Sequence, residues 1–156
     1  MQNFVTPEEK LKKELRDYSL IFTVFAIGNF LFFYLEFLRG SFDVGKIAFA
    51  NGISENTAFW LVIVSITLEV IAIAAKSVMA IIGFSQVKDK YKKRAHITIA
   101  KVFFIYNIFM IILSIYNILK LVSGLTSLIS PLISMIFIGY YIKTADSLYK
   151  VKSKKA

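Results

Sequence analysis

Four long apolar tracts limit what this chain can fold into more than any other feature. They cover residues 18–38, 57–84, 97–119 and 121–142. A helix of about 20 apolar residues is long enough to cross a bilayer, and each tract reaches that length. A soluble four-helix bundle would carry a polar stripe along each helix, and these tracts have none. The tracts therefore predict an all-α integral membrane protein built as a bundle of four transmembrane helices.

Charge is kept apart from these tracts, as expected for a membrane protein. Hydrophobic residues make up 57% of the chain and its mean hydropathy is +0.66, above the range of ordinary soluble domains. The segments between the tracts are too short to fold as soluble domains. We therefore expect residues 1–156 to form a single membrane domain, with polar segments at 1–17, 39–56, 85–96 and 143–156.

The N-terminal segment carries a helix start signal. Thr6 can serve as N-cap, Pro7 occupies the first helical position, and Glu9 lies three residues after the cap. Residues 1–17 are therefore predicted to form an amphipathic N-terminal helix that leads into the first span. In the outer loop, 39–56, a short strand or an interfacial helix is expected around residues 44–50.

The basic residues predict the orientation of the chain. Three segments are rich in Lys and Arg: 1–17, the loop 85–96 and the tail 143–156, whereas 39–56 has fewer. The positive-inside rule then places both termini and the loop 85–96 in the cytoplasm. We expect a multi-pass protein of the cell membrane. Topology alone accounts for this bias. A second interpretation is contact with anionic lipid headgroups through Lys88, Lys90, Lys92, Lys93 and Arg94. Nucleic-acid binding is not expected, because no binding fold accompanies these residues.

Glu69 is the residue that most needs an explanation beyond packing. It lies nine residues after Trp60, which suits the outer headgroup level, and therefore roughly 14 Å deeper, near the centre of a ~30 Å hydrocarbon core. A charged carboxyl at this depth costs at least ~2.5–3.5 kcal/mol. We expect Glu69 to be buried, and Lys76, closer to the cytoplasmic boundary, to extend its ammonium to water.

The other spans offer polar side chains at a similar depth. Counting from the ends of each tract places Asn29, Asn107, Ser130 and Ser134 near the level of Glu69. These five residues are predicted to form a midplane polar cluster. The alternative is structural, because Ser and Asn commonly hydrogen-bond between membrane helices without a further role. Ser127 and Gly139 belong to a stripe of small residues that favours close helix packing.

Catalytic chemistry is not indicated. The chain has no cysteine, and its one histidine, His96, follows the basic loop, where we interpret it as an interfacial residue. Neither the spacing of a metal site nor that of a phosphate-binding loop is present. The sequence predicts neither an enzyme nor a protein with a metal or cofactor.

Two main functions are compatible with this pattern, and binding of a lipid or hydrophobic ligand among the spans is a third possibility. The first is a scaffold or accessory subunit, which associates with copies of itself in a homo-oligomer or with a larger membrane complex. The alternative is permeation of a proton, cation or small solute along a path that includes Glu69.

Overall fold

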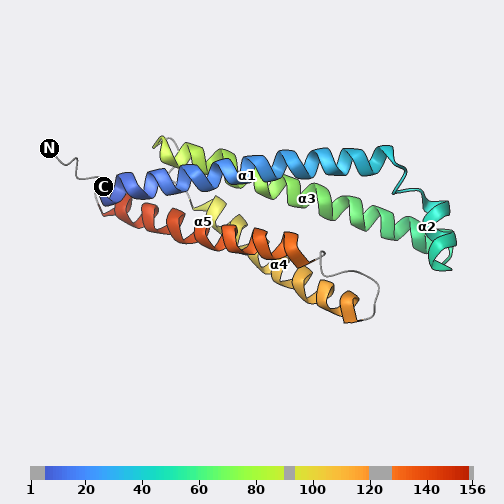
Figure 1. Ribbon diagram of the computed structural model, residues 1–156. Helices are drawn as coiled ribbons and strands as arrows, with labels where there is room; N and C mark the ends of the chain where they lie inside the picture. The colour runs from blue at the N-terminus through green and yellow to red at the C-terminus, as the bar shows by residue number, and fades with distance from the viewer. Residues whose placement is uncertain (1–5, 90–93, 120–127, 155–156) are drawn as a thin grey trace. The chain divides into compact units, whose positions relative to one another are not determined.

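The computed structural model describes residues 6–89, 94–119 and 128–154. Within these residues it contains five helices and no strand, so the all-α prediction is confirmed (Figure 1). The helices are α1 (Pro7–Leu38), α2 (Val44–Asn51), α3 (Glu55–Val87), α4 (Ala95–Leu119) and α5 (Ile129–Ser153).

Three of these helices are long and apolar enough to cross a membrane. They are α1, α3 and the Ala95–Tyr116 part of α4. Three of the four predicted apolar tracts therefore form helices whose length and composition fit a membrane protein. Residues 120–127, which hold the beginning of the predicted fourth tract, lie outside the described residues.

The first helix continues from the N-terminal segment into the first apolar tract, as the sequence predicts. α1 runs without interruption from Pro7 to Leu38, so the N-terminal helix and the first apolar tract are one element. The predicted start signal is confirmed. The Glu9 backbone N–H donates to Thr6 Oγ1 at 3.2 Å, and the Thr6 backbone N–H donates to Glu9 Oε2 at 2.8 Å. Each of these two hydrogen bonds satisfies a backbone N–H that has no acceptor within the helix.

The outer loop contains the short helix α2. Asp43 caps it by accepting a hydrogen bond from the Lys46 backbone N–H at 3.1 Å. Gly52 ends it with a left-handed φ of 62°, a conformation that glycine adopts without steric cost. Of the two expected alternatives for residues 44–50, the helix is therefore the one that forms.

The helices belong to two compact units. One, here called the terminal unit, consists of the described residues of 1–22 and 78–156, and the other, the central unit, consists of residues 23–77. The boundary between them crosses α1 after Phe22 and α3 after Ser77.

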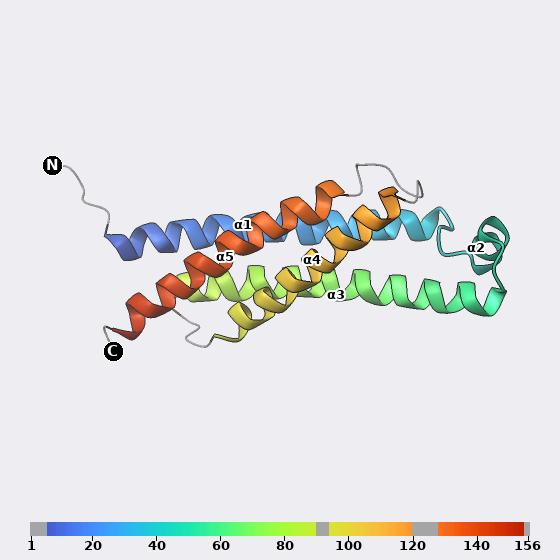
Figure 2. The ribbon, with the colours of Figure 1, turned by 90° about the horizontal axis from the view of Figure 1, so that it is seen from below.

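The terminal unit has a core made by the first part of α1, the last part of α3, α4 and α5. α4 and α5 pack against each other, as Figures 1 and 2 both show. The ring of Phe22 on α1 meets the edge of Tyr141 on α5, with ring centroids 5.4 Å apart. The largest apolar side chains without solvent exposure come from three helices: Leu15, Phe22, Met79, Ile138 and Leu148.

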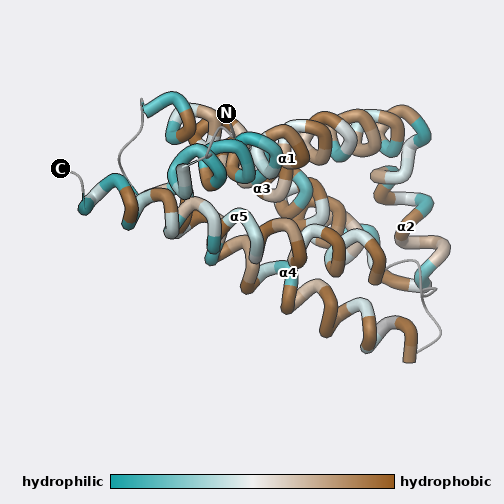
Figure 3. Tube along the Cα trace, turned by 60° about the vertical axis from the view of Figure 1, so that its left-hand side comes forward, coloured by the Kyte–Doolittle hydropathy of each residue, from teal (hydrophilic) through white to brown (hydrophobic). Residues whose placement is uncertain are grey.

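In the terminal unit, the two halves of α5 differ in polarity. Residues 129–142 carry no charge, whereas the remainder of α5, up to Ser153, carries charged side chains (Figure 3). The predicted basic tail, 143–156, is therefore helical through Ser153. Helix-forming residues such as Ala145, Leu148 and Lys150 explain this continuation, since no Gly or Pro interrupts them.

The central unit contains the remainder of α1 and α3 and the whole of α2. Phe33 and Phe42 pack with ring centroids 5.6 Å apart near the end of α1. Its buried apolar residues are small, mainly alanines such as Ala26, Ala58 and Ala72. Small residues permit close approach of membrane helices, where dispersion contacts must replace the hydrophobic effect.

Candidate functional site

The five residues of the predicted midplane polar cluster are divided between the two units. Asn29 and Glu69 belong to the central unit, and Asn107, Ser130 and Ser134 to the terminal unit. Asn107 and Ser134 are buried, Asn29 is half-buried, and Glu69 and Ser130 are exposed. Asn107 donates its side-chain N–H to the Phe103 carbonyl of its own helix at 2.8 Å. That the five residues meet in one cluster stays a prediction.

Within the central unit, the structure reverses the expectation for Glu69 and Lys76. Lys76 is only 5% exposed, whereas Glu69 is exposed. When the Asn29 amide is oriented so that its nitrogen donates to the Phe25 carbonyl, its oxygen accepts from Lys76 Nζ at 2.7 Å. The lysine stem therefore does not carry its ammonium out to water, because an amide oxygen on α1 receives it.

Glu69 interrupts a buried stripe on α3. Ala58, Val62, Ala72 and Lys76 share one face of the helix and all four are buried. Glu69 lies seven residues from both Val62 and Lys76 and so shares that face, yet it is exposed together with Ser65. The carboxylate on this face is therefore exposed, although its neighbours along the face, apart from Ser65, are buried.

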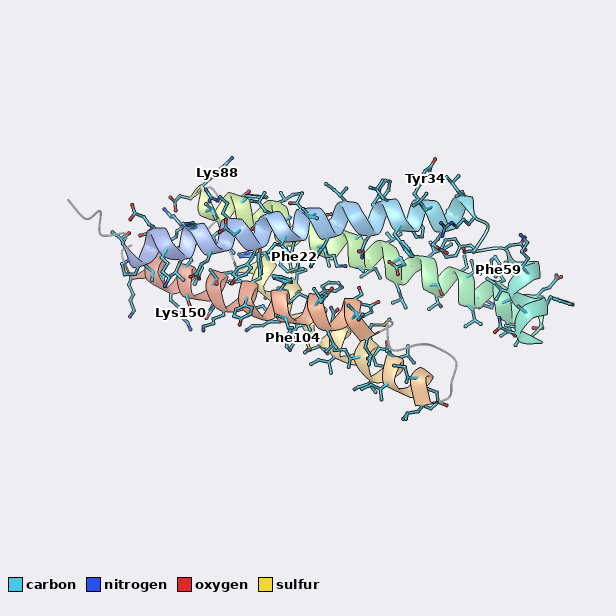
Figure 4. All side chains as sticks on the ribbon, in the orientation of Figure 1. Phe22, Tyr34, Phe59, Lys88, Phe104 and Lys150 are labelled. Carbon is cyan, nitrogen blue, oxygen red and sulfur yellow. The ribbon has the colours of Figure 1, made fainter. Side chains whose placement is uncertain are left out.

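The structure describes some, but not all, of the residues that are predicted to mediate helix packing or to contact lipid headgroups. A Cβ at Gly139 on α5 would lie 3.7 Å from the Phe104 ring of α4, which Figure 4 labels, so this glycine faces α4. Lys88 and Arg94 are exposed. Ser127, Lys90, Lys92 and Lys93 lie outside the described residues.

A buried polar pair that the sequence reasoning missed lies in the terminal unit. His96 is 0% exposed and Gln86 is 2% exposed. His96 Nε2 is 2.7 Å from Gln86 Oε1, and Gln86 Nε2 donates to the Ala145 carbonyl at 3.3 Å. Because the Gln86 amide nitrogen is directed to a carbonyl, its oxygen is the acceptor, and the proton between the two side chains belongs to His96 Nε2.

His96 is therefore buried within the protein, and its position at the membrane interface stays a prediction. The edge of Tyr141 covers the imidazole, with ring centroids 5.9 Å apart. α3 ends at Val87 and α4 begins at Ala95, so Gln86 and His96 occupy the ends of two consecutive helices. Their pairing joins α3 to α4, and the bond to Ala145 extends the connection to α5.

Gly83 marks the closest approach of helices in the terminal unit. A Cβ at this position would overlap Ser19 Oγ of α1 and would lie 3.1 Å from Tyr141 Oη of α5. Ser19 Oγ is itself held by donating to the Leu15 carbonyl at 2.8 Å. Tyr141 Oη donates to the Met79 carbonyl at 2.7 Å, one helical turn before Gly83. Only a residue without a side chain fits between these two groups.

Asp89 joins three segments at the rim of the terminal unit. Its carboxylate lies 2.8 Å from Lys12 Nζ of α1 and 2.5 Å from Lys152 Nζ of α5. Lys152 also donates to the Gln86 carbonyl at 2.6 Å, a cation at the C-terminal end of α3, where the helix dipole favours it. Hydrogen bonds from Lys12 and Lys152 lower the pKa of Asp89 to about 2.

We expect these ion pairs to stabilise the protein only when Asp89 is ionised. The pKa of Asp89 is lower in the folded than in the unfolded chain, so its contribution is complete above about pH 4 and is lost as the pH falls toward 2. Asp89→Asn keeps a residue that tolerates the left-handed φ of 60° found here. Thermal unfolding of the wild type and Asp89→Asn in detergent should differ at pH 6 and converge near pH 2.

Asp17→Asn provides the control for this measurement. Asp17 is exposed and pairs with the adjacent Arg16 at 3.4 Å, so removal of its charge should change the unfolding temperature little. A pH-independent difference between the wild type and Asp89→Asn would contradict the assigned role of the carboxylate.

A weak sequence signal for the missed residues exists. Ser19, Gly83, Gln86, His96 and Tyr141 all lie near the ends of the apolar tracts that the charge pattern assigns to one side of the membrane. Depth counting had directed attention to the middle of the tracts instead. In the part of the chain that the structure describes, no three His, Cys, Asp or Glu residues group closely enough to hold a metal ion.

Neither a known protein family, nor a curated protein, nor a solved structure matches this chain.

Proposed function

We propose that the chain is a scaffold or accessory subunit that assembles inside the membrane through the α3 face that carries Glu69. The observation that supports it is the exposure of Glu69 and Ser65 on a face that is otherwise buried. Exposed apolar side chains can face lipid, but a carboxyl in the middle of an apolar helix cannot do so without a cost of a few kcal/mol. A protein partner that covers this face removes the cost.

A second copy of this chain is the partner that the chemistry of Glu69 favours. Copies that insert with one orientation are related by an axis along the membrane normal, which brings both Glu69 side chains to the same depth. A protonated carboxyl has one donor and a free acceptor, so two such groups satisfy each other. Ser65, one turn from Glu69, adds a hydroxyl to the same face.

The proposed topology keeps four spans, with both termini and the loop 85–96 cytoplasmic. The fourth span is the predicted tract 121–142, of which the structure describes residues 128–142. Support comes from Asp89, which lies next to the loop and pairs with Lys12 near the beginning of the chain and Lys152 near its end. Segments joined in this way are expected on one side of the membrane, which agrees with an even number of crossings between them.

Glu69 substitutions test the assembly. Glu69→Leu removes the interhelical hydrogen bonds of the carboxyl pair. The loss of one such bond, worth about 1–2 kcal/mol in model membrane peptides, weakens a dimer about five- to thirtyfold, so we expect a weakening of at least about fivefold. Glu69→Gln keeps a donor and an acceptor and should retain it. The dimer fraction is measured in lipid vesicles over a dilution series in lipid. Equal dimer fractions for Glu69→Leu and the wild type would contradict the proposal.

The absence of cysteine allows a direct test of the interface. A single thiol at Ser65→Cys should form a disulfide between two copies in membranes on mild oxidation. Ile71→Cys is the matched control, because Ile71 is exposed on another face of α3. A crosslink of equal yield at both positions indicates random collision and would overturn the proposed face.

Permeation of a proton, cation or small solute remains the second candidate. Its supporting observation is that Lys76 is buried within an apolar helix, where ionisable residues commonly mark a path. The same Glu69 variants decide between the two candidates. Flux through vesicles that Glu69→Gln abolishes, while the dimer persists, would favour permeation over a scaffold.

A further inference from the structure

We propose that α4 and α5 bind the phosphate of an anionic lipid headgroup between Lys101 and Lys143. This site is separate from the Glu69 face, and its two lysines lie outside the basic loop 85–96. Both lysines are exposed, and neither forms an ion pair within the described residues. The sequence predicts headgroup contact at the basic loop, and this proposal places a headgroup site on two other residues.

The packing of the two helices places these lysines at one level. Arg94, directly before α4, pairs with Asp146 of α5, and further along Phe104 of α4 faces Gly139 of α5, so the two helices are antiparallel. Lys101 lies three residues before Phe104, and Lys143 lies three residues before Asp146. Between the two contacts, both lysines therefore stand at about the same height along the pair.

Helical spacing also places both lysines at the α4–α5 seam. Lys101 lies three residues before Phe104, which faces Gly139 of α5, so it shares the face of α4 that meets α5. Lys143 is four residues from Gly139 and three from Asp146, so it shares the face of α5 that meets α4. Because both remain exposed, they lie at the rim of the seam rather than inside it.

The carboxylate nearest to this rim along either helix is already neutralised. Asp146 pairs with Arg94 and, at 2.8 Å, with Lys150 Nζ. Arg94 in turn lies over the ring of Tyr149, 4.6 Å from its centroid. The seam thus presents Arg94, Lys101, Lys143 and Lys150 against one acidic side chain, an excess of positive charge that attracts an anion.

The positions of Lys101 and Lys143 along their helices favour a lipid headgroup over a free anion as the ligand. Lys101 is the last charge on α4, since residues 102–119 carry none, and Lys143 is the first on α5 after the charge-free residues 129–142. Both therefore stand at the boundary between headgroups and hydrocarbon. Beyond them Ile105 and Ile136 are 66% and 53% exposed, so acyl chains can lie against the same helices.

The test uses the full chain in detergent, titrated with phosphatidylglycerol and observed by native mass spectrometry. Each basic residue near an anionic headgroup strengthens binding about fivefold, so Lys101→Gln/Lys143→Gln should weaken binding about thirtyfold. Lys10→Gln/Lys13→Gln removes the same charge from exposed sites on α1 and should bind within about twofold of the wild type. Lys101→Arg/Lys143→Arg should retain binding, which separates charge from misfolding.

Two further arms distinguish the source of the phosphate. Phosphatidylcholine should not replace phosphatidylglycerol, because its headgroup has no net charge. Millimolar inorganic phosphate should not displace the lipid, because it lacks acyl chains. Displacement by inorganic phosphate, or equal weakening in the seam variant and its α1 control, would overturn the proposal.

Discussion

Replacing Gly83 by alanine is expected to destabilise the terminal unit by about 1–3 kcal/mol, the usual cost of overfilling a packed interior. The added Cβ overlaps Ser19 Oγ and lies 3.1–3.2 Å from two atoms of Tyr141. Neither neighbour can move freely, since Ser19 and Tyr141 are both buried and hydrogen-bonded to backbone carbonyls. Denaturant unfolding of the detergent-solubilised protein measures the effect.

Gly28→Ala is the matched control for this substitution. Gly28 also lies inside a helix, but a Cβ there meets nothing within 4 Å. Its replacement should be neutral or slightly stabilising, because alanine favours the helix more than glycine does. Adding Ser19→Ala to Gly83→Ala removes the overlapping oxygen and should restore part of the stability. Equal effects of Gly83→Ala and Gly28→Ala would show that the close approach is not maintained.

The second large effect is expected at the buried pair of Gln86 and His96. Gln86→Leu leaves the His96 Nε2–H without its acceptor in an interior site, and an unsatisfied buried group costs about 1–3 kcal/mol. His96→Phe should also destabilise, since it leaves the Gln86 oxygen without its donor. The double variant Gln86→Leu/His96→Phe should cost less than the two single changes added together, because both partners are then apolar.

A double-mutant cycle makes this expectation quantitative. Residues in direct contact usually couple by 0.5–3 kcal/mol, whereas independent sites add within about 0.3–0.5 kcal/mol. The free energy of unfolding of the four proteins, measured in one detergent at pH 8, gives the coupling. Strict additivity would mean that the two side chains do not act on each other in the folded protein.

Local sequence signals predicted the helices well because they act within a few residues. The capping box at Thr6 and Glu9 forms as the spacing predicts, and the apolar tracts become long helices. Hydropathy separates the polar segment 1–17 from the first tract, but the backbone continues as one helix because no residue between Pro7 and Leu38 stops it.

Depth counting identified Glu69 and Lys76 as unusual but assigned their environments incorrectly. Counting along a helix gives height, and it does not say which neighbour faces a residue at that height. Lys76 is buried because Asn29 on α1 can accept its hydrogen bond, and that pairing depends on how two distant parts of the chain meet. Lys101 received no role for a similar reason, since it lies inside the predicted tract 97–119.

By itself, the sequence determined that this protein is all-helical and apolar enough for a membrane, because hydropathy and helix length act through local composition. The tertiary structure decided which polar groups are buried together. Gln86 meets His96, and Gly83 admits Ser19 and Tyr141, through contacts between helices far apart in the chain. Such contacts depend on the rotation and register of each helix against its neighbours, which a pattern of apolar tracts does not specify.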